Sequence, residues 1–154
     1  MSVFLADEQS ESVNLEQLRE IAELILREEG YPGETEVTVL LVNEDEMSSY
    51  NERFLSRSGP TDVLAFPVEE LAPGLVPDHD PNGPPLMIGD VIIAPAYVGR
   101  QASEYDVSFH DEMALMVTHG ILHLLGYDHI DDPEAEHMER RETELLSMVG
   151  LKRR

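Results

Sequence analysis

The sequence contains no cysteine among its 154 residues. Disulfides and thiolate metal ligands are therefore excluded, and the absence fits a reducing compartment, so we expect a cytoplasmic protein. No apolar run approaches the roughly 18 residues of a membrane span. Residues 1–10 lack the basic start and apolar stretch of a secretory signal. We therefore expect no membrane partner.

Basic residues are also scarce. Ten lysines and arginines stand against 32 aspartates and glutamates, which gives a formal net charge of −22 at pH 7. Nucleic-acid binders usually show a basic footprint, so this charge lowers the expectation of nonspecific polyanion binding. It favours a solvated acidic surface, and it would also suit a basic partner protein. Basic residues could still gather locally, in particular Arg53, Arg57, Arg100 and Lys152–Arg154.

Hydrophobic periodicity and capping signals divide the chain into strands and helices. Asn14 and Asn43 each begin a capping box, and Ser108 precedes a helix with an acidic first turn. Asp132 and Pro133 form an N-cap and N1 pair for the last helix. We predict strands over 3–5, 36–42, 62–66 and 89–94, and helices over about 15–29, 44–55, 95–105, 109–125 and 133–148.

The order of these elements predicts an α/β (mixed α+β) fold. We expect a small, mostly parallel sheet of about four strands, covered by about five helices. Six of the ten prolines fall between Pro67 and Pro85, so residues 68–85 should form a long loop. Residues 150–154 read as a basic tail. Residues 1–154 should thus form a single domain.

Three histidines stand at informative spacing near the end of the chain. His119 and His123 are four residues apart, which places both imidazoles on one face of the predicted helix. Gly126 can adopt a left-handed backbone, end the helix and return His129 toward the first two. Three unrelated histidines are the simpler alternative, but half of all six fall within eleven residues. The pattern favours an open, catalytic metal site on the central helix and the following turn.

The same spacing occurs in one class of zinc peptidases. Those enzymes have a glutamate directly after the first histidine, and it serves as the general base for the attacking water. Gly120 occupies that position here. A peptidase without this base would lose a factor of about 10²–10⁴ in rate, so Gly120 disfavours that activity.

Three segments resemble the YbeY family of bacterial ribosomal RNA maturation factors. The sequence His-Gly-Ile-Leu-His-Leu-Leu-Gly-Tyr-Asp-His at 119–129 resembles the family signature. Residues 59–67 resemble its Pro-Thr-Asp-Val-Leu-Ser-Phe-Pro block, with Ala65 in place of the usual serine. Residues 89–93 resemble its Gly-Asp-Ile strand. The order and separations agree, so the resemblance extends over most of the chain.

The resemblance implies a single-strand-specific, metal-dependent endoribonuclease that hydrolyses phosphodiesters with a metal-bound water. The family acts in 3′ end maturation of small-subunit ribosomal RNA and in ribosome quality control. Implied partners are single-stranded or ribosomal RNA, with ribosomal proteins or small-subunit assembly factors. The implied cofactor is one Zn²⁺ on His119, His123 and His129, although imidazoles also suit other divalent transition metals. An alternative is a metal-containing ribosome-biogenesis binding factor with little intrinsic nuclease activity.

Further catalytic candidates lie beside these histidines. Asp128 could orient a water or hold a histidine tautomer, or it could simply cap the turn. Many family members have an arginine where this chain has Leu55. Arg53 and Arg57 flank this position, and either could replace it, but a two-residue offset on a helix would turn the side chain away by about half a circle. Of the two, Arg57 is kept as the candidate. A surface arginine is the alternative for Arg57.

Overall fold

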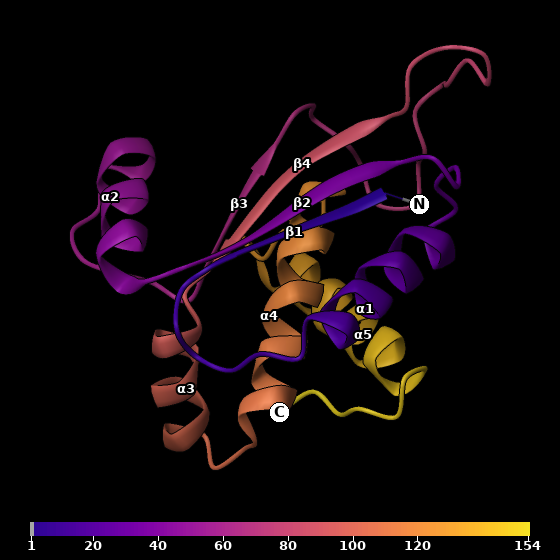
Figure 1. Ribbon diagram of the computed structural model, residues 1–154. Helices are drawn as coiled ribbons and strands as arrows, with labels where there is room; N and C mark the ends of the chain where they lie inside the picture. The colour runs from indigo at the N-terminus through magenta and orange to yellow at the C-terminus, as the bar shows by residue number, and fades with distance from the viewer. Residues whose placement is uncertain (1) are drawn as a thin grey trace.

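A four-stranded sheet organises the protein, whose computed structural model describes residues 2–154 (Figure 1). The strands lie in the order β1-β2-β4-β3. The first three of these are mutually parallel, and β3 runs antiparallel to β4 at the edge. The predicted α/β fold with a mostly parallel sheet is thus confirmed. The strands are β1 (Ser2–Glu8), β2 (Glu36–Val42), β3 (Val63–Pro67) and β4 (Met87–Ile93).

The strand ends differ from the predicted ones because pairing extends beyond the apolar runs. β1 continues to Glu8, since it pairs residue for residue with β2 from Ser2 onward. Pro67 belongs to β3 rather than stopping it. β3 is an edge strand, where the missing N–H of a proline costs no ladder hydrogen bond.

Five helices pack around the sheet, and three of their predicted N-caps are confirmed. The side chains of Asn14, Asn43 and Ser108 each accept a hydrogen bond from the backbone N–H three residues later, at 2.9–3.1 Å. The predicted cap of the last helix was wrong by one residue. Asp131, not Asp132, accepts the N–H of Glu134 at 2.8 Å. The helices are α1 (Leu15–Glu28), α2 (Glu44–Leu55), α3 (Pro95–Glu104), α4 (Phe109–Leu124) and α5 (Asp132–Ser147).

The helices divide between the two faces of the sheet. α1, α4 and α5 cover one face, and α2 lies apart on the other (Figure 1). α4 is the central helix, and every residue from Glu112 to Thr118 is buried. Its hydrophobic side chains pack against Val39, Val91 and Ile93 of the sheet. Burial of this apolar surface, worth about 25 cal/mol per Å², fixes the helix that carries two of the histidines.

The predicted long loop follows β3 and leads into β4 (Figure 1). Its first part packs on the body of the protein, where the backbone of Leu71 and Ala72 passes directly over Gly126, and a later part projects beyond the sheet (Figure 1). No helix within residues 2–154 is long and apolar enough to cross a membrane.

Candidate metal centre

His119 and His123 project from the same face of α4, as their spacing predicts. Their ring centroids lie 4.6 Å apart, and both side chains are half-buried. Between these two histidines, α4 comes close to the sheet at Gly120, which lines the same cleft as they do. A Cβ added there would lie 2.6 Å from Cγ1 of Val91. A glutamate at this position would therefore clash with Val91 of the sheet, which further disfavours a peptidase.

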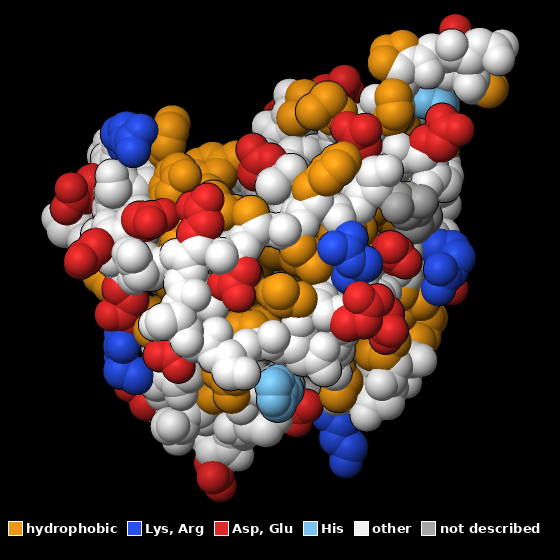
Figure 2. Space-filling view, in the orientation of Figure 1, with side chains coloured by type: hydrophobic (Ala, Val, Ile, Leu, Met, Phe, Trp, Pro, Cys, Tyr) orange, Lys and Arg blue, Asp and Glu red, His pale blue; other side chains and the backbone are white. Residues whose placement is uncertain are grey.

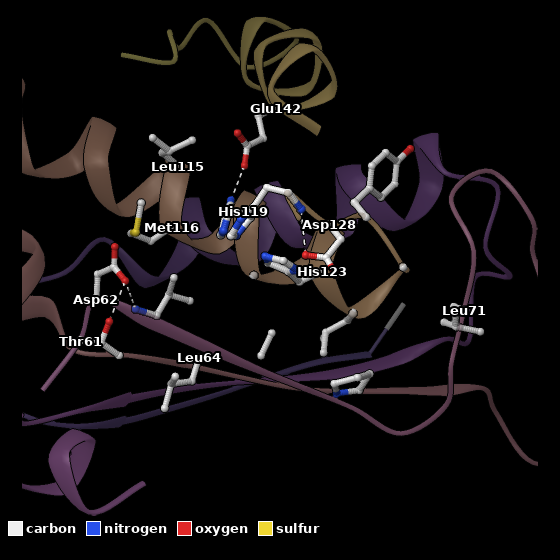
Figure 3. Close-up of a pocket in the computed structure, with 18 of the residues that line it drawn as sticks. Thr61, Asp62, Leu64, Leu71, Leu115, Met116, His119, His123, Asp128 and Glu142 are labelled. Carbon is white, nitrogen blue, oxygen red and sulfur yellow. Dashed lines mark hydrogen bonds and ion pairs between the residues drawn. The ribbon is translucent and has the colours of Figure 1, made fainter. Parts of the chain in front are cut away.

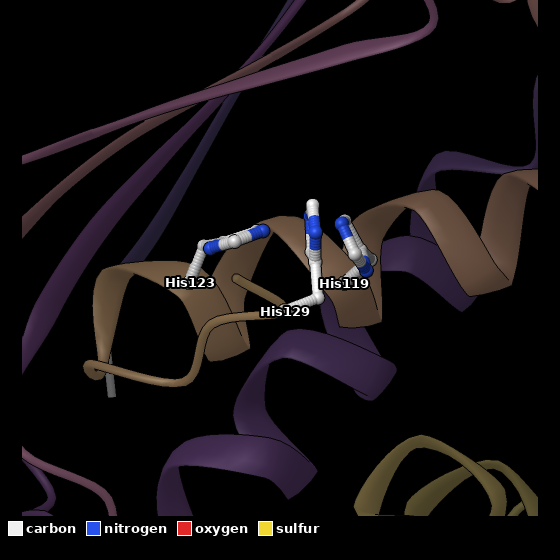
Figure 4. A group of neighbouring side chains, drawn as sticks. All are labelled: His119, His123 and His129. Atoms are coloured by element: carbon white, nitrogen blue, oxygen red, sulfur yellow. The ribbon is translucent and has the colours of Figure 1, made fainter. Parts of the chain in front are cut away.

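The turn after α4 brings the third histidine to the first two. Gly126 has φ +101°, the left-handed conformation that its place in the sequence predicts. Its N–H donates to the carbonyl of His123, and the N–H of Tyr127 donates to that of Leu122, at 3.1 and 3.0 Å. The ring of His129 then lies 5.4 Å from that of His119 and 5.0 Å from that of His123 (Figure 4).

The three imidazoles form a group that could hold a metal ion. One nitrogen from each ring lies within 4.8 Å of the others. Burial, followed by the neighbouring His119 and His129, lowers the pKa of His123 to about 4. At neutral pH this ring therefore offers a lone pair rather than a second proton, as a metal ligand must. The donor set fits a transition metal with at least one position left for another ligand.

A buried carboxylate orients the first histidine. Glu142 of α5 is 1% exposed, and its Oε2 lies 2.7 Å from Nδ1 of His119 (Figure 3). Burial disfavours the charged carboxylate, but hydrogen bonds from His119 and Arg153 outweigh it and lower the pKa of Glu142. With Nδ1 occupied in this way, Nε2 of His119 is the nitrogen that remains for a metal.

From the sequence alone, the charged face of the last helix, with Glu134, Glu139 and Glu142, is expected to be solvated, and for Glu142 that expectation is wrong. The signal was present in the sequence, because Glu142 is four residues after Met138 and three before Leu145. Both of those residues are buried, so Glu142 shares their helix face. An acid in an apolar stripe indicates a buried partner, but periodicity does not say which one.

The histidines line a cleft of about 740 Å³. One wall is α4 with its following turn, and the other is β3 with residues 69–71 (Figure 3). Leu55, Arg57, Arg153 and Arg154 line it as well. A cleft of this size admits a nucleotide-sized group.

The structure places the remaining candidates as follows. Asp128 lines the cleft, and its Oδ1 accepts the N–H of His129 at 2.8 Å, which caps the turn. Arg57 lies beyond the end of α2, after Ser56 in a left-handed conformation. The helical offset expected to turn Arg57 away was therefore wrong, since the helix ends at Leu55. Tyr127 is buried, 5% exposed, and packs in the core.

Fold and site together define an α/β protein with a cluster of three histidines, able to hold a metal, at a cleft beside the edge of its sheet. The family model described as Endoribonuclease YbeY matches residues 4–150. The chain therefore belongs to the endoribonuclease YbeY family, as the three resembling segments predicted.

Relatives bearing the name Endoribonuclease YbeY are similar over nearly the whole chain. That of Acidothermus cellulolyticus is 39% identical over 155 residues, covering 100% of this chain and 94% of the relative. That of Thermobifida fusca is 41% identical over 147 residues, covering 96% and 93%. That of Bacillus subtilis is 38% identical over 145 residues, covering 92% of each.

A solved structure shares the fold. The solution structure of TM1509 from Thermotoga maritima superposes with a TM-score of 0.62 at 31% sequence identity. The alignment covers 96% of this chain and 91% of that protein. The architecture of this chain is thus that of an experimentally determined protein.

Proposed function

We propose that this chain is a single-strand-specific, metal-dependent endoribonuclease that acts in maturation of the 3′ end of small-subunit ribosomal RNA and in ribosome quality control. The observation that supports it most is the cluster of His119, His123 and His129 in the cleft of a protein whose relatives are named as endoribonucleases. We propose that the whole chain works as one hydrolase domain, in the cytoplasm.

We propose Zn²⁺ as the cofactor, held by the three histidines. A divalent cation there would supply Lewis-acid polarisation of a phosphoryl oxygen and a lowered pKa for a bound water. The chain supplies the rest. Glu142 holds His119 in one tautomer, and the buried face of α4 fixes the separation of His119 from His123. Because Gly120 offers no side chain, no separate base follows the first histidine.

Arg57 is the residue that we propose for the phosphate of the substrate. It lines the cleft and is exposed, and within the described residues it forms no ion pair. The two other arginines of the cleft, Arg153 and Arg154, are paired with carboxylates. A guanidinium beside the scissile phosphate would stabilise the charge that develops in phosphoryl transfer. Asp128 beside His129 would orient a water in the cleft.

Replacement of His123 by alanine tests the function. The variant should keep the fold, lose bound metal and lose cleavage of single-stranded RNA, since two imidazoles bind a metal far more weakly than three. The matched control is His110→Ala, an exposed histidine at the start of the same helix, which should cleave normally. Unchanged cleavage by the folded His123→Ala protein would reject the hydrolase.

The same variant distinguishes the proposed nuclease from the alternative role, that of a binding factor for ribosome biogenesis. Partner proteins of the small subunit, basic as a class, would suit the net charge of −22. If His123→Ala loses cleavage but still associates with ribosomal subunits, both roles exist and are separate. If the unaltered chain binds subunits and cleaves no RNA with metal supplied, the binding role alone is left.

A further inference from the structure

The segment 150–154 turns back onto the helices of the metal centre. Gly150 has φ +76°, which lets the chain reverse after α5. The N–H of Leu151 donates to the carbonyl of Leu146 at 2.9 Å, and the Leu151 side chain packs against the core. The side chains of Arg153 and Arg154 are consequently only 22% and 25% exposed. The sequence suggested a basic tail, but these two arginines are docked.

Each arginine is docked on a buried glutamate. Nε of Arg153 donates to Oε1 of Glu142 at 2.8 Å, and Nε of Arg154 donates to both oxygens of Glu112 at 2.8 and 2.9 Å. Both glutamates are 1% exposed. A buried carboxylate without a cationic partner is strongly disfavoured, so both pairs support the fold.

Only one of the two pairs reaches the metal centre. The second oxygen of Glu142 contacts Nδ1 of His119 at 2.7 Å, whereas Oε2 of Glu112 accepts a hydrogen bond from Gln101 at 2.7 Å. The chain thus contains two adjacent arginines with the same kind of partner and burial. One of them acts on a histidine of the cluster through its glutamate, and the other does not.

The contacts of Arg153 fix the plane of the Glu142 carboxylate. Its guanidinium also donates to the carbonyl of Arg154 at 2.8 Å and lies 3.5 Å from Glu139. A guanidinium held at three points presents Nε in one direction. Oε1 of Glu142 must face it, and Oε2 is left facing His119. Without Arg153, rotation of the carboxylate would break the contact that selects the tautomer of His119.

We propose that Arg153 is a positioning residue of the metal centre. It holds the Glu142 carboxylate in the orientation that receives the Nδ1 proton of His119, and so leaves Nε2 of His119 aimed at the metal. This inference rests on the proposed function, because it takes His119 as a metal ligand. A carboxylate behind a ligating histidine is a general device. What is specific here is that a residue eleven positions later holds that carboxylate.

The first experiment compares Arg153→Gln with Arg154→Gln. Zn²⁺ affinity of each purified, metal-free full chain is measured by competition with a chromophoric chelator, alongside thermal unfolding. Both variants lose one buried ion pair, so both should be destabilised. Only Arg153→Gln should bind Zn²⁺ more weakly, by about 10–100-fold, as other changes behind metal-ligating histidines do. Equal affinities in the two variants would overturn the proposal and leave Arg153 a purely structural role.

The second experiment reads the tautomer directly and requires no metal. Side-chain ¹⁵N shifts of His119 are recorded for the metal-free protein at alkaline pH, where the imidazoles are neutral. The unaltered chain and Arg154→Gln should show the tautomer protonated at Nδ1, and Arg153→Gln should shift toward the Nε2-protonated form. If Arg153→Gln fails to fold, the tautomer of His119 in the unaltered chain still tests the proposal. A His119 protonated mainly at Nε2 there would overturn the proposal.

These results are distinguishable from a failure of the proposed function. If the unaltered chain binds no Zn²⁺ or other transition metal, the metal centre itself is rejected. If it binds metal tightly and Arg153→Gln binds as tightly as Arg154→Gln, only the positioning role is rejected.

Discussion

Tyr127 holds the turn that returns His129 to the cluster, and its hydroxyl gives the fold a pH dependence. Burial and the nearby Glu29 raise the pKa of Tyr127 above the ordinary value of 10.0, and the same two causes raise that of Tyr31. The folded state therefore keeps protons that the unfolded state releases above pH 10. The stabilising contribution of both tyrosines is present below about pH 10 and is lost as the pH rises toward their folded-state pKa values.

We therefore expect the free energy of unfolding to fall above pH 10, by up to about 1.4 kcal/mol per pH unit for each tyrosine. Urea unfolding at a series of alkaline pH values measures this slope. Tyr127→Phe should reduce it, because phenylalanine has no proton to lose. Tyr105→Phe is the control, since Tyr105 is 54% exposed, and it should leave the slope as it is. A slope unaffected by Tyr127→Phe would contradict the assignment.

The site shows what residue spacing can and cannot predict. The three histidines and Gly126 are close together in the sequence. The relative placement of the three imidazoles therefore follows from their spacing alone. Glu142 is 23 residues from His119, and Arg153 a further eleven. Their meeting depends on how α5 and the segment after it cross α4, which is decided by core packing rather than by any local pattern.

At the scale of elements, the close approach of α4 to the sheet sets the position of the histidine cluster. Gly120 lies where the helix crosses β3 and β4, and an added Cβ would meet Cγ1 of Val91 at 2.6 Å and Cγ2 of Val63 at 3.2 Å. These are branched side chains on strand backbone and cannot swing away cheaply. The absence of a side chain at Gly120 thus has a packing cause, in addition to its consequence for peptidase chemistry.

Gly120→Ala should consequently destabilise the protein. Overpacking costs about 1–3 kcal/mol, against a gain of roughly 1 kcal/mol from replacing glycine inside a helix, so a net loss is expected. Gly99→Ala in α3 is the matched control, because its Cβ would lie 3.7 Å from Phe109, an ordinary contact. That variant should gain stability in the same urea titration. If Gly120→Ala were equally stabilised, the helix and sheet would not be in the tight contact described.

Element types were predictable to a greater extent than element ends. The apolar periodicity and the caps gave all five helices and four strands, because those signals are contained in each segment. The ends of β1 and β4 depend on neighbours across the sheet, and the strand order β1-β2-β4-β3 depends on pairing between distant segments. Neither these strand ends nor the strand order follows from a local sequence pattern, so neither could be predicted.

For the whole molecule, the dominant property is its negative charge. Acidic side chains are spread over the surface, and on the face shown in Figure 2 the basic ones stand between them. An RNA strand carries the same sign, so the long-range field opposes association. In the cleft, Arg153 and Arg154 are already neutralised by carboxylates, and Arg57 is the arginine that we propose for a phosphate. For the proposed nuclease, association with RNA would therefore depend on the metal centre and on contacts that do not neutralise many phosphates.

This charge distribution predicts an unusual salt dependence for the proposed nuclease. Nucleic-acid binders that neutralise six to ten phosphates lose about 10³–10⁵ in affinity between 50 and 200 mM salt. A single arginine contact to a single strand gives a slope of about −0.7, or roughly a threefold loss over the same range. Screening of the repulsion between RNA and a protein of net charge −22 acts in the opposite direction. Measured kcat/KM for single-stranded RNA should thus be nearly independent of salt concentration or should rise with it, and Arg57→Gln should remove whatever decrease exists.

A fall of kcat/KM by several orders of magnitude over this range would contradict the prediction. It would mean that RNA follows a basic surface elsewhere on the molecule, and the cleft beside the histidines would not be its main binding site.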